Sequence, residues 1–186
     1  MSRWQPDARE RLERAAVELF VEQGFAETTV PQIAERAGLT TRTYFRHFAD
    51  KREALFGSED ELAPMIAGLM ADAPASLSPF DAIAQALNTV ASRLQPQYEF
   101  MVVRHRVVQA DDGLRERELR KRAALAAEIT KGFQVRGEDD LTSLVAASLA
   151  TGIMGLSIER WLNGSGSESL PDLVRHALTA ARGLLS

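Results

Sequence analysis

The sequence predicts an all-α protein of about nine to ten helices. Apolar residues recur at spacings of three and four along nearly the whole chain, which is the period of an amphipathic helix. Alternating stretches rich in Val, Ile and Tyr between turn signals, the pattern of strands, are missing. With 186 residues, of which 45% are apolar, the chain is long enough for one full-sized domain or for two small ones that share a core.

Start and stop signals place four helices in the first part of the chain. Thr or Asp stands at each start and can accept hydrogen bonds from the first free N–H groups of the helix. Glycine follows the first two helices, where it ends a helix without strain. The expected elements are Asp7–Gln23 with the capping pair Asp7 and Glu10, Val30–Ala37 after Thr29 with Gln32, a third capped by Thr40 and running to about His47, and a fourth that starts at Lys51 after Asp50 with Glu53.

Longer helices are expected in the rest of the chain. Pro, Gly, Ser and Asp gather in the breaks between the apolar-periodic stretches, and these residue types end helices and form turns. Ser169 with Asp172 caps the last helix. The expected ranges are Asp60–Ala71, Phe80–Leu94, Tyr98–Ala110, Leu114–Val135, Asp140–Leu162 and Leu170–Leu185.

Composition excludes several classes of protein. The chain has no cysteine, so thiolate chemistry and Cys-ligated metals are ruled out, which fits a reducing cytoplasm. The N-terminus lacks the apolar stretch of a signal peptide. The charge-free run 141–158 reaches the lower limit of a membrane span, but it contains five Ser or Thr residues and two glycines. A buried or interfacial helix is therefore favoured over a span, and we expect a soluble, cytoplasmic protein without membrane contact.

The second and third expected helices form a helix-turn-helix. They are too short to be stable alone, so they must pack against each other and against the first helix. The joint Gly38-Leu39-Thr40 connects them, and Ala34 lets the two backbones approach closely. Ile33 and Tyr44 are expected in the wedge between them. This is the geometry of a DNA-reading motif.

The outward face of the third helix is free of acidic residues. It presents Thr41, Arg42, Phe45 and Arg46, with His47 at its end. Arg pairs bidentately with guanine, Thr bonds base edges or touches the thymine methyl, and a ring packs on sugar or methyl groups. Between residues 36 and 52, five Lys or Arg residues stand against one Asp, although the whole chain has a net charge of −4. This local excess of positive charge is the expected signal of a DNA contact.

Helix starts beside this face are expected to hold phosphates. The free N–H groups after Thr29 and after Asp50 favour anions, and Lys51 adds a positive charge next to one of them. Such contacts would fix the register on the duplex without reading its sequence.

Many fixed spacings run through the first third of the chain. They read Ala16-x-x-Leu19-Phe20-x-x-x-Gly24-Phe25-x-x-Thr28-Thr29-Val30-x-x-Ile33-Ala34-x-x-Ala37-Gly38-Leu39-Thr40, followed by Arg46-His47-Phe48-x-x-Lys51. In this pattern the chain resembles the tetracycline-repressor (TetR) family of bacterial regulators. The resemblance implies a homodimeric, all-helical repressor. Its DNA-binding domain would comprise residues 1–56, and residues 57–186 would bind a small molecule and dimerise through the last two helices.

The resemblance also implies which residues contact DNA. They are Thr29, Thr40, Thr41, Arg42, Thr43, Phe45, Arg46, His47 and Lys51. One position departs from the family pattern: where the family usually has Leu-Tyr, this chain has Tyr44-Phe45, so a phenolic hydroxyl that would bond a phosphate is absent. Either Tyr44 supplies a substitute bond or one phosphate anchor is lost.

The larger domain contains candidates for an effector cavity. Methionine and aromatic side chains suit a mostly apolar ligand, and Arg104 and His105 are the polar groups that would orient it. Plain core packing is the alternative for each residue. The candidates are Met65, Phe100, Met101, Arg104, His105 and Met154.

The last two helices are expected to form half of a four-helix bundle across a two-fold axis. The segment 141–158 is rich in small residues that let a partner helix come close, and Trp161, Leu173, Val174 and Leu178 add apolar surface. A helix buried within one monomer is the alternative. Dimerisation is favoured because one short recognition helix rarely provides enough affinity and specificity.

These observations predict a ligand-responsive transcriptional repressor that binds a palindromic double-stranded operator and is released or modulated by a small, mostly apolar effector. The alternative is a DNA-bound structural or interaction factor that responds to no small molecule. An enzyme is not expected, since the sequence lacks nucleophile-elbow, zincin and phosphate-loop motifs and its three histidines are far apart. No cofactor or metal is expected.

Overall fold

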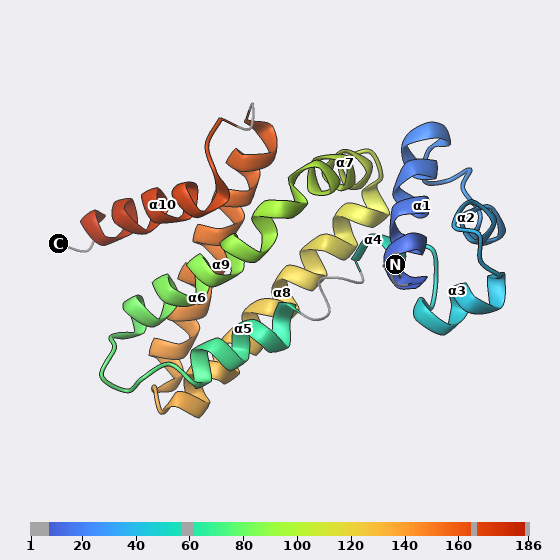
Figure 1. Cartoon of the computed structure of the whole chain (residues 1–186). Helices are drawn as coiled ribbons and strands as arrows, with labels where there is room; N and C mark the ends of the chain where they lie inside the picture. Colours follow the sequence, from blue (N-terminus) through green and yellow to red (C-terminus); the bar gives the residue numbers. More distant parts are fainter. Residues whose placement is uncertain (1–7, 57–61, 165–166, 185–186) are drawn as a thin grey trace, which may run out of the picture. The chain divides into compact units, whose positions relative to one another are not determined.

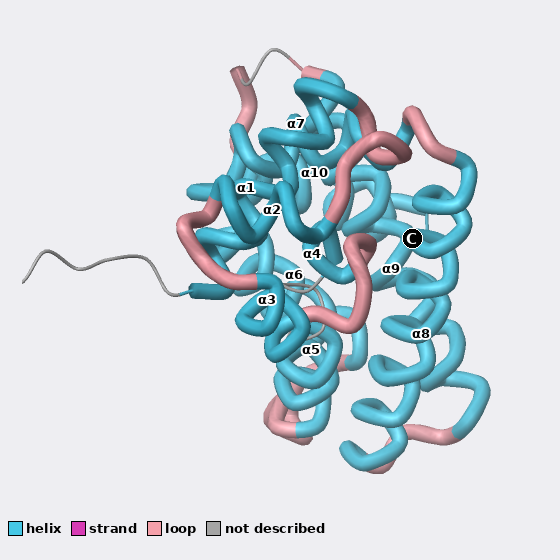
Figure 2. The backbone as a smooth tube through the Cα atoms, turned by 90° about the vertical axis from the view of Figure 1, so that its right-hand side faces the viewer, coloured by secondary structure: helices cyan, strands magenta, loops and turns pink. Residues whose placement is uncertain are grey.

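The computed structural model describes residues 8–56, 62–164 and 167–184. Within these ranges the chain consists of helices joined by loops, without a strand (Figure 2). The all-α fold class is therefore confirmed. The chain divides into two units: the head unit, which holds the described residues of 1–60 and 103–116, and the body unit, which holds those of 61–102 and 117–186.

The head unit contains four helices and parts of two more. They are α1 (Ala8–Gln23), α2 (Val30–Arg36), α3 (Thr41–His47), α4 (Glu53–Phe56), the second part of α7 (Tyr98–Gln109) and the start of α8 (Asp112–Arg136) (Figure 1). α1 packs against α2, α3 and α4, and α2 packs against α3. Leu12, Ile33, Tyr44 and Leu55 are almost completely buried between them. This burial stabilises helices that would be marginal alone at four to seven residues.

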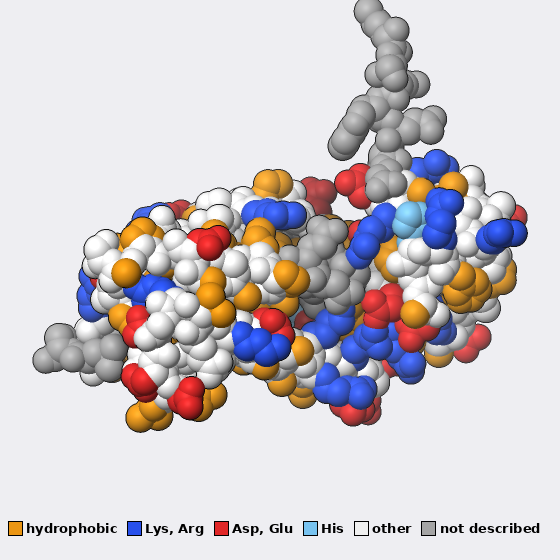
Figure 3. Space-filling view, turned by 90° about the horizontal axis from the view of Figure 1, so that it is seen from below, with side chains coloured by type: hydrophobic (Ala, Val, Ile, Leu, Met, Phe, Trp, Pro, Cys, Tyr) orange, Lys and Arg blue, Asp and Glu red, His pale blue; other side chains and the backbone are white. Residues whose placement is uncertain are grey.

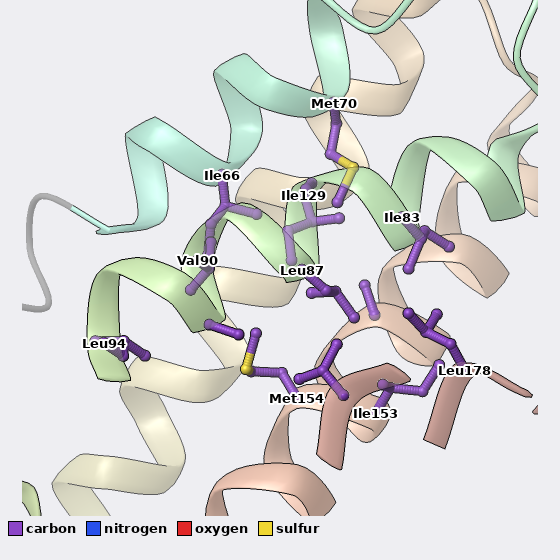
Figure 4. Packing of buried hydrophobic residues seen from close by; sticks show 14 of the residues in the cluster. Ile66, Met70, Ile83, Leu87, Val90, Leu94, Ile129, Ile153, Met154 and Leu178 are labelled. Atoms are coloured by element: carbon purple, nitrogen blue, oxygen red, sulfur yellow. The ribbon is translucent and has the colours of Figure 1, made fainter. Parts of the chain in front are cut away.

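The body unit is built around one hydrophobic cluster. Its elements are α5 (Leu62–Ala71), α6 (Pro79–Leu94), the short 3-10 helix η2 (Gln95–Gln97), α9 (Asp140–Asn163), α10 (Leu170–Leu184) and the remaining parts of α7 and α8. α9 packs against α6 and α10, and α6 also packs against α5 and α10. Side chains from five of these helices point toward one another in the cluster, among them Met70, Leu87, Ile129, Met154 and Leu178 (Figure 4).

Helix ends lie within two residues of the expected positions. Thr40 Oγ1 accepts a hydrogen bond from the Thr43 N–H (3.1 Å), and Ser169 Oγ accepts one from the Asp172 N–H (3.2 Å), so both expected caps are confirmed. The expected starts at Asp7 and Asp60 and the expected end at Leu185 lie outside the described residues.

The start of α4 corrects one expectation. Asp50 Oδ1 accepts hydrogen bonds from the N–H groups of both Arg52 (2.7 Å) and Glu53 (3.0 Å). These two bonds hold Lys51 and Arg52 in a turn, and the helix begins at Glu53 instead of at Lys51. Asp50 is the capping residue, as expected, but the helix starts two residues later than expected.

α9 has the length and composition of a membrane-spanning helix. It has 24 residues, and 39% of its most apolar window is buried inside the protein. It packs against α6 and α10 and contributes Ala146, Ala147 and Ala150 to the hydrophobic cluster. One face of α9 is thus packed in the core of the body unit, which fits the expectation of a buried or interfacial helix for 141–158.

Candidate nucleic-acid interface

The turn between α2 and α3 depends on Gly38. Its φ of +66° lies in the left-handed region that other L residues rarely adopt, and a Cβ there would lie 3.0 Å from Arg11 Nη2. The Gly38 N–H donates to Glu35 O (2.9 Å), and the Leu39 N–H donates to Ala34 O (2.8 Å). These bonds fix the direction in which the chain enters α3, as a helix-turn-helix requires.

Tyr44 anchors the inward face of α3. Its side chain is fully buried, and its hydroxyl donates a hydrogen bond of 3.0 Å to the carbonyl oxygen of Asp50. Burial raises the pKa of the Tyr44 phenol, and the Asp50 carboxylate adds to the rise, so the hydroxyl stays protonated at neutral pH. The hydroxyl is thus already hydrogen-bonded inside the head unit, so Tyr44 does not supply the substitute phosphate bond.

The outward face of α3 is exposed and carries no acidic side chain. Thr41, Arg42, Phe45 and Arg46 are exposed, and His47 is half-buried next to Arg46. Arg42 has no hydrogen-bond or ion-pair partner among the described residues. In the space-filling view, basic side chains flank a histidine on one side of the head unit (Figure 3). The structure therefore brings the base-reading candidates of the sequence onto one open surface.

Three of the predicted threonine contacts lie at helix starts. Thr40 Oγ1 accepts from the Thr43 N–H and lies 3.0 Å from Thr43 Oγ1. Before α2, Gln32 Oε1 accepts hydrogen bonds from the N–H (2.8 Å) and the hydroxyl (2.9 Å) of Thr29, so the expected capping pair is present. These threonines are held in place by the same bonds that start the helices.

Lys51 is bound to the loop between α1 and α2. Its Nζ donates to the carbonyl oxygens of Phe25 (2.7 Å), Ala26 (3.1 Å) and Thr28 (3.0 Å), and it lies 4.4 Å from the Phe25 ring centroid. An ammonium group has three hydrogens, so all three have an acceptor within the head unit. A direct phosphate bond from Lys51 would have to replace one of these carbonyl bonds.

The positive charge of the interface is smaller than the sequence count indicates. Arg36 pairs bidentately with Glu22, with distances of 2.9 and 2.7 Å, and Glu18 lies 3.5 Å away. The hydrogen bond from Arg36 lowers the pKa of Glu22. The counted excess between residues 36 and 52 is thus partly neutralised by acids of α1. The charge available to a duplex on α3 comes from Arg42 and Arg46.

The six effector-cavity candidates fall in two units. Met65 and Met101 pack against the hydrophobic cluster of the body unit, of which Met154 is a member, and Phe100 is half-buried in the same unit. Arg104 and His105 belong to the head unit. A surface hollow of about 320 Å³ lies in the head unit and is lined by none of the six. Among the described residues, no group of three His, Asp or Glu side chains is placed to hold a metal ion.

Arg104 has a role that its sequence context does not indicate. Only 3% of the residue is exposed, its Nε donates to the Leu55 carbonyl oxygen (2.7 Å), and its guanidinium lies 4.8 Å from the Phe56 ring centroid. The residue thus connects the α7 part of the head unit to α4. Forty-nine positions separate Arg104 from Leu55, so no local pattern could have revealed the contact.

The outward face of α9 is apolar. Leu141, Leu144, Val145 and Leu156 are exposed by 56 to 71%, and a Cβ added at Gly152 or Gly155 would meet open space. Exposed apolar side chains that gather on one helix face are typical of a surface covered by another protein.

Comparison with known proteins identifies the class to which this site belongs. The model of the family described as "Bacterial regulatory proteins, tetR family" matches residues 13–57, which include the complete helix-turn-helix. Residues 13–57 thus match the model of this family, as the sequence resemblance indicated, and the chain has the fold of solved TetR-family regulators. The similar proteins are transcriptional regulators and not enzymes.

One curated relative is the HTH-type transcriptional regulator TcmR of Streptomyces glaucescens. It is 37% identical over 87 residues, which are 47% of this chain and 38% of that relative. The match therefore spans less than half the length of the relative.

Solved structures extend the likeness in fold to the whole chain. A TetR-like transcriptional regulator from Rhodococcus sp. RHA1 has a TM-score of 0.58 at 20% identity, covering 98% of both chains. Thermus thermophilus FadR, described as a TetR-family transcriptional repressor in complex with lauroyl-CoA, has a TM-score of 0.55 at 24% identity and covers 92% of this chain and 91% of its own. At these identities the likeness establishes the fold alone.

Proposed function

We propose that this protein is a ligand-responsive transcriptional repressor that binds a palindromic operator as a homodimer. The observation that carries the proposal is the exposed, acid-free face of α3, on which Arg42 has no partner among the described residues. A free guanidinium at the start of a recognition helix suits bidentate pairing with guanine in the major groove. The protein would act in the cytoplasm, where its DNA is found.

The proposed DNA contacts divide into two groups. Thr41, Arg42, Phe45 and Arg46 would face base edges from the exposed side of α3. Phosphates and sugars would be met by the residues at the starts of α2 and α3, at the end of α3 and in the turn before α4, which fix position without reading sequence. This second group comprises Thr29, Thr40, Thr43, His47 and Lys51, with Lys51 acting mainly through its charge and the loop that it holds.

The dimer is proposed to form through α9 and α10. The exposed apolar face of α9 supports this assignment, because leaving such a surface in water is costly and a second copy offers the same surface. A two-fold dimer would place two recognition helices in successive major grooves, about 34 Å apart.

Selection from random-sequence duplexes tests the DNA-binding part. The full chain is incubated with the duplex pool at low salt, and the bound fraction is sequenced after several rounds. We expect one enriched motif with inverted half-sites. The double variant Arg42→Ala, Arg46→Ala should lose the enrichment, while Arg14→Ala, Arg106→Ala, which removes two exposed arginines of the same unit, should retain it. A pool that stays random with the unmodified protein would overturn the proposal.

The effector is proposed to be mostly apolar and to bind in the body unit. Met65, Phe100, Met101 and Met154 are the residues proposed to contact it, whereas Arg104 is already bonded within the head unit and His105 belongs to that unit as well. The lauroyl-CoA in the complex of Thermus thermophilus FadR makes acyl-CoA thioesters a reasonable first set of probes.

A thermal-shift screen with lauroyl-CoA, longer acyl-CoAs and free fatty acids distinguishes the two functions that the sequence left open. A true effector raises the melting temperature with concentration and releases the selected operator. A DNA-bound structural factor would show neither effect with any compound.

A further inference from the structure

Phe45 is a large apolar side chain exposed on the recognition helix. Its exposed fraction is 56%, although the rest of the face consists of hydroxyl and guanidinium groups. Its ring meets the buried ring of Tyr44 edge-on, with centroids 5.7 Å apart and an interplanar angle of 84°. Because the Tyr44 hydroxyl is bonded to Asp50, the ring against which Phe45 packs is itself fixed. The Phe45 ring is thus exposed to solvent and packs against a buried side chain that is itself fixed.

The position of Phe45 places it with the base-reading candidates. Thr41 and Arg42 precede it by four and three residues, so the three side chains share one face of α3. If this face enters a major groove, the Phe45 ring lies next to base edges instead of outside the groove.

The chemistry of the ring limits what it can contact. A phenyl group donates and accepts no ordinary hydrogen bond, so it gains nothing from a phosphate oxygen or from the polar edges of guanine, adenine or cytosine. The apolar group that B-DNA presents in the major groove is the C5-methyl group of thymine. Covering a methyl with an exposed ring removes two apolar surfaces from water at once.

We propose that Phe45 is a specificity-determining residue that packs on the C5-methyl group of a thymine in each operator half-site. This inference rests on the proposed DNA-binding function and names one base that the site reads. It also predicts that the protein recognises this thymine by its C5-methyl group and needs no hydrogen bond to that base.

Deoxyuridine substitution isolates that methyl group, because it removes the C5-methyl of thymine and leaves base pairing unchanged. Each thymine of the selected operator is replaced in turn, symmetrically in both half-sites, and the affinity of the full chain is measured. We expect one position at which affinity falls about fourfold per half-site, the effect of losing one buried carbon, and about 15-fold for the pair. The other thymines should show little change.

Variants assign the effect to Phe45. Phe45→Ala should bind the thymine and deoxyuridine operators equally, and Phe45→Leu, which keeps an apolar side chain, should restore part of the discrimination. Thr41→Ser, which removes the methyl group of Thr41 from the same face of the helix and keeps its hydroxyl, should retain the full effect. Thermal melting of each variant confirms that the exposed substitution leaves the fold intact.

The outcomes separate this inference from the proposed function. If the unmodified protein enriches no duplex, the DNA-binding proposal fails. If it binds its operator but no deoxyuridine substitution changes the affinity, or if the operator contains no thymine, only the proposal that Phe45 contacts a thymine is overturned. A methyl effect that persists in Phe45→Ala and disappears in Thr41→Ser would assign the contact to Thr41 and also overturn it.

Discussion

The Nε atom of Arg104 donates a hydrogen bond of 2.7 Å to the carbonyl oxygen of Leu55, and the exposed fractions of the two residues are only 3% and 1%. Leu55 lies in α4, which has four residues, so its carbonyl cannot be satisfied within the helix. The Phe56 ring beneath the guanidinium adds a cation–π contact. Arg104 therefore satisfies a buried backbone acceptor and holds α4 in the head unit.

Replacement of Arg104 by Met should destabilise the head unit. The change keeps much of the apolar stem but removes a charge-assisted bond and leaves the Leu55 carbonyl buried without it, at a cost of about 2 kcal/mol. Urea unfolding followed by circular dichroism measures the loss. Arg106→Met, an exposed arginine on the same helix, is the matched control and should stay within about 0.5 kcal/mol of the unmodified protein. Equal stabilities for the two variants would contradict the role of Arg104.

Lys51→Met should also lower the stability of the head unit. Three carbonyl oxygens, those of Phe25, Ala26 and Thr28, lose their ammonium donor, and the expected cost is about 1–3 kcal/mol in urea unfolding. Lys131→Met, which breaks an exposed pair with Glu128, is the control and should cost less than about 1 kcal/mol.

The salt dependence of DNA binding separates the two roles of Lys51. Loss of a direct phosphate contact would reduce the slope of log affinity against log salt by about 0.9. Because the ammonium is bonded to three carbonyls, we expect a smaller change in slope. If Lys51→Met reduces this slope by the full amount of about 0.9 and leaves the free energy of unfolding unchanged, Lys51 binds a phosphate directly.

Most of the fold could be predicted because helix ends carry local signals. The Thr40 hydroxyl that starts α3 and the Ser169 hydroxyl at the start of α10 are both recognisable from sequence, and each forms the bond that its position indicates. α4 shows the limit of such signals. Asp50 is recognisable as a cap, but its carboxylate serves two successive N–H groups, and this geometry moves the helix start by two residues.

The site was harder to predict because its electrostatics depend on contacts between distant segments. Arg36 is neutralised by Glu22, 14 residues away, and Lys51 is bound by Phe25, 26 residues away. Neither partner has a fixed sequence spacing, so a count of charges between residues 36 and 52 overstates the charge of the interface. The identity of the outward residues on α3 was predictable, since it follows from helix periodicity alone.

Tyr44→Phe should produce a stability difference that depends on pH. At neutral pH the variant loses one hydrogen bond to the Asp50 carbonyl, a cost of about 1 kcal/mol. Burial raises the pKa of Tyr44, so above about pH 10 the unfolded chain releases a proton that the folded chain retains. The contribution of the Tyr44 phenol to the free energy of unfolding is therefore at its maximum below about pH 10 and falls as the pH rises further. Phenylalanine does not ionise, so the variant lacks this dependence on pH.

Urea unfolding of both proteins between pH 8 and pH 11 tests this dependence. The advantage of the unmodified protein over Tyr44→Phe should shrink above about pH 10. A difference that stays constant through this range would mean that the phenol is not buried and protonated in the folded state.

Arg42→Ala should mainly weaken sequence discrimination. If Arg42 pairs bidentately with a guanine, its loss costs about 1–3 kcal/mol on the selected operator and much less on random duplexes. Arg14→Ala, which removes an exposed arginine from α1, serves as the control for a loss of charge alone. Equal weakening of selected and random duplexes by Arg42→Ala would reject a base contact for this residue.

Leu144→Asp on the outward face of α9 should convert the proposed dimer to a monomer. The leucine is 56% exposed in the single chain, and in a two-fold dimer through α9 the introduced carboxylate would be buried without a partner at a cost of several kcal/mol. Val21→Asp on α1 is the control, because Val21 is 59% exposed and belongs to the head unit and not to the two helices of the proposed interface. Sedimentation velocity at micromolar concentration should show a monomer for Leu144→Asp and a dimer for Val21→Asp. The monomeric variant should also bind a full operator no better than a single half-site, whereas a dimer that survives Leu144→Asp would place the interface elsewhere.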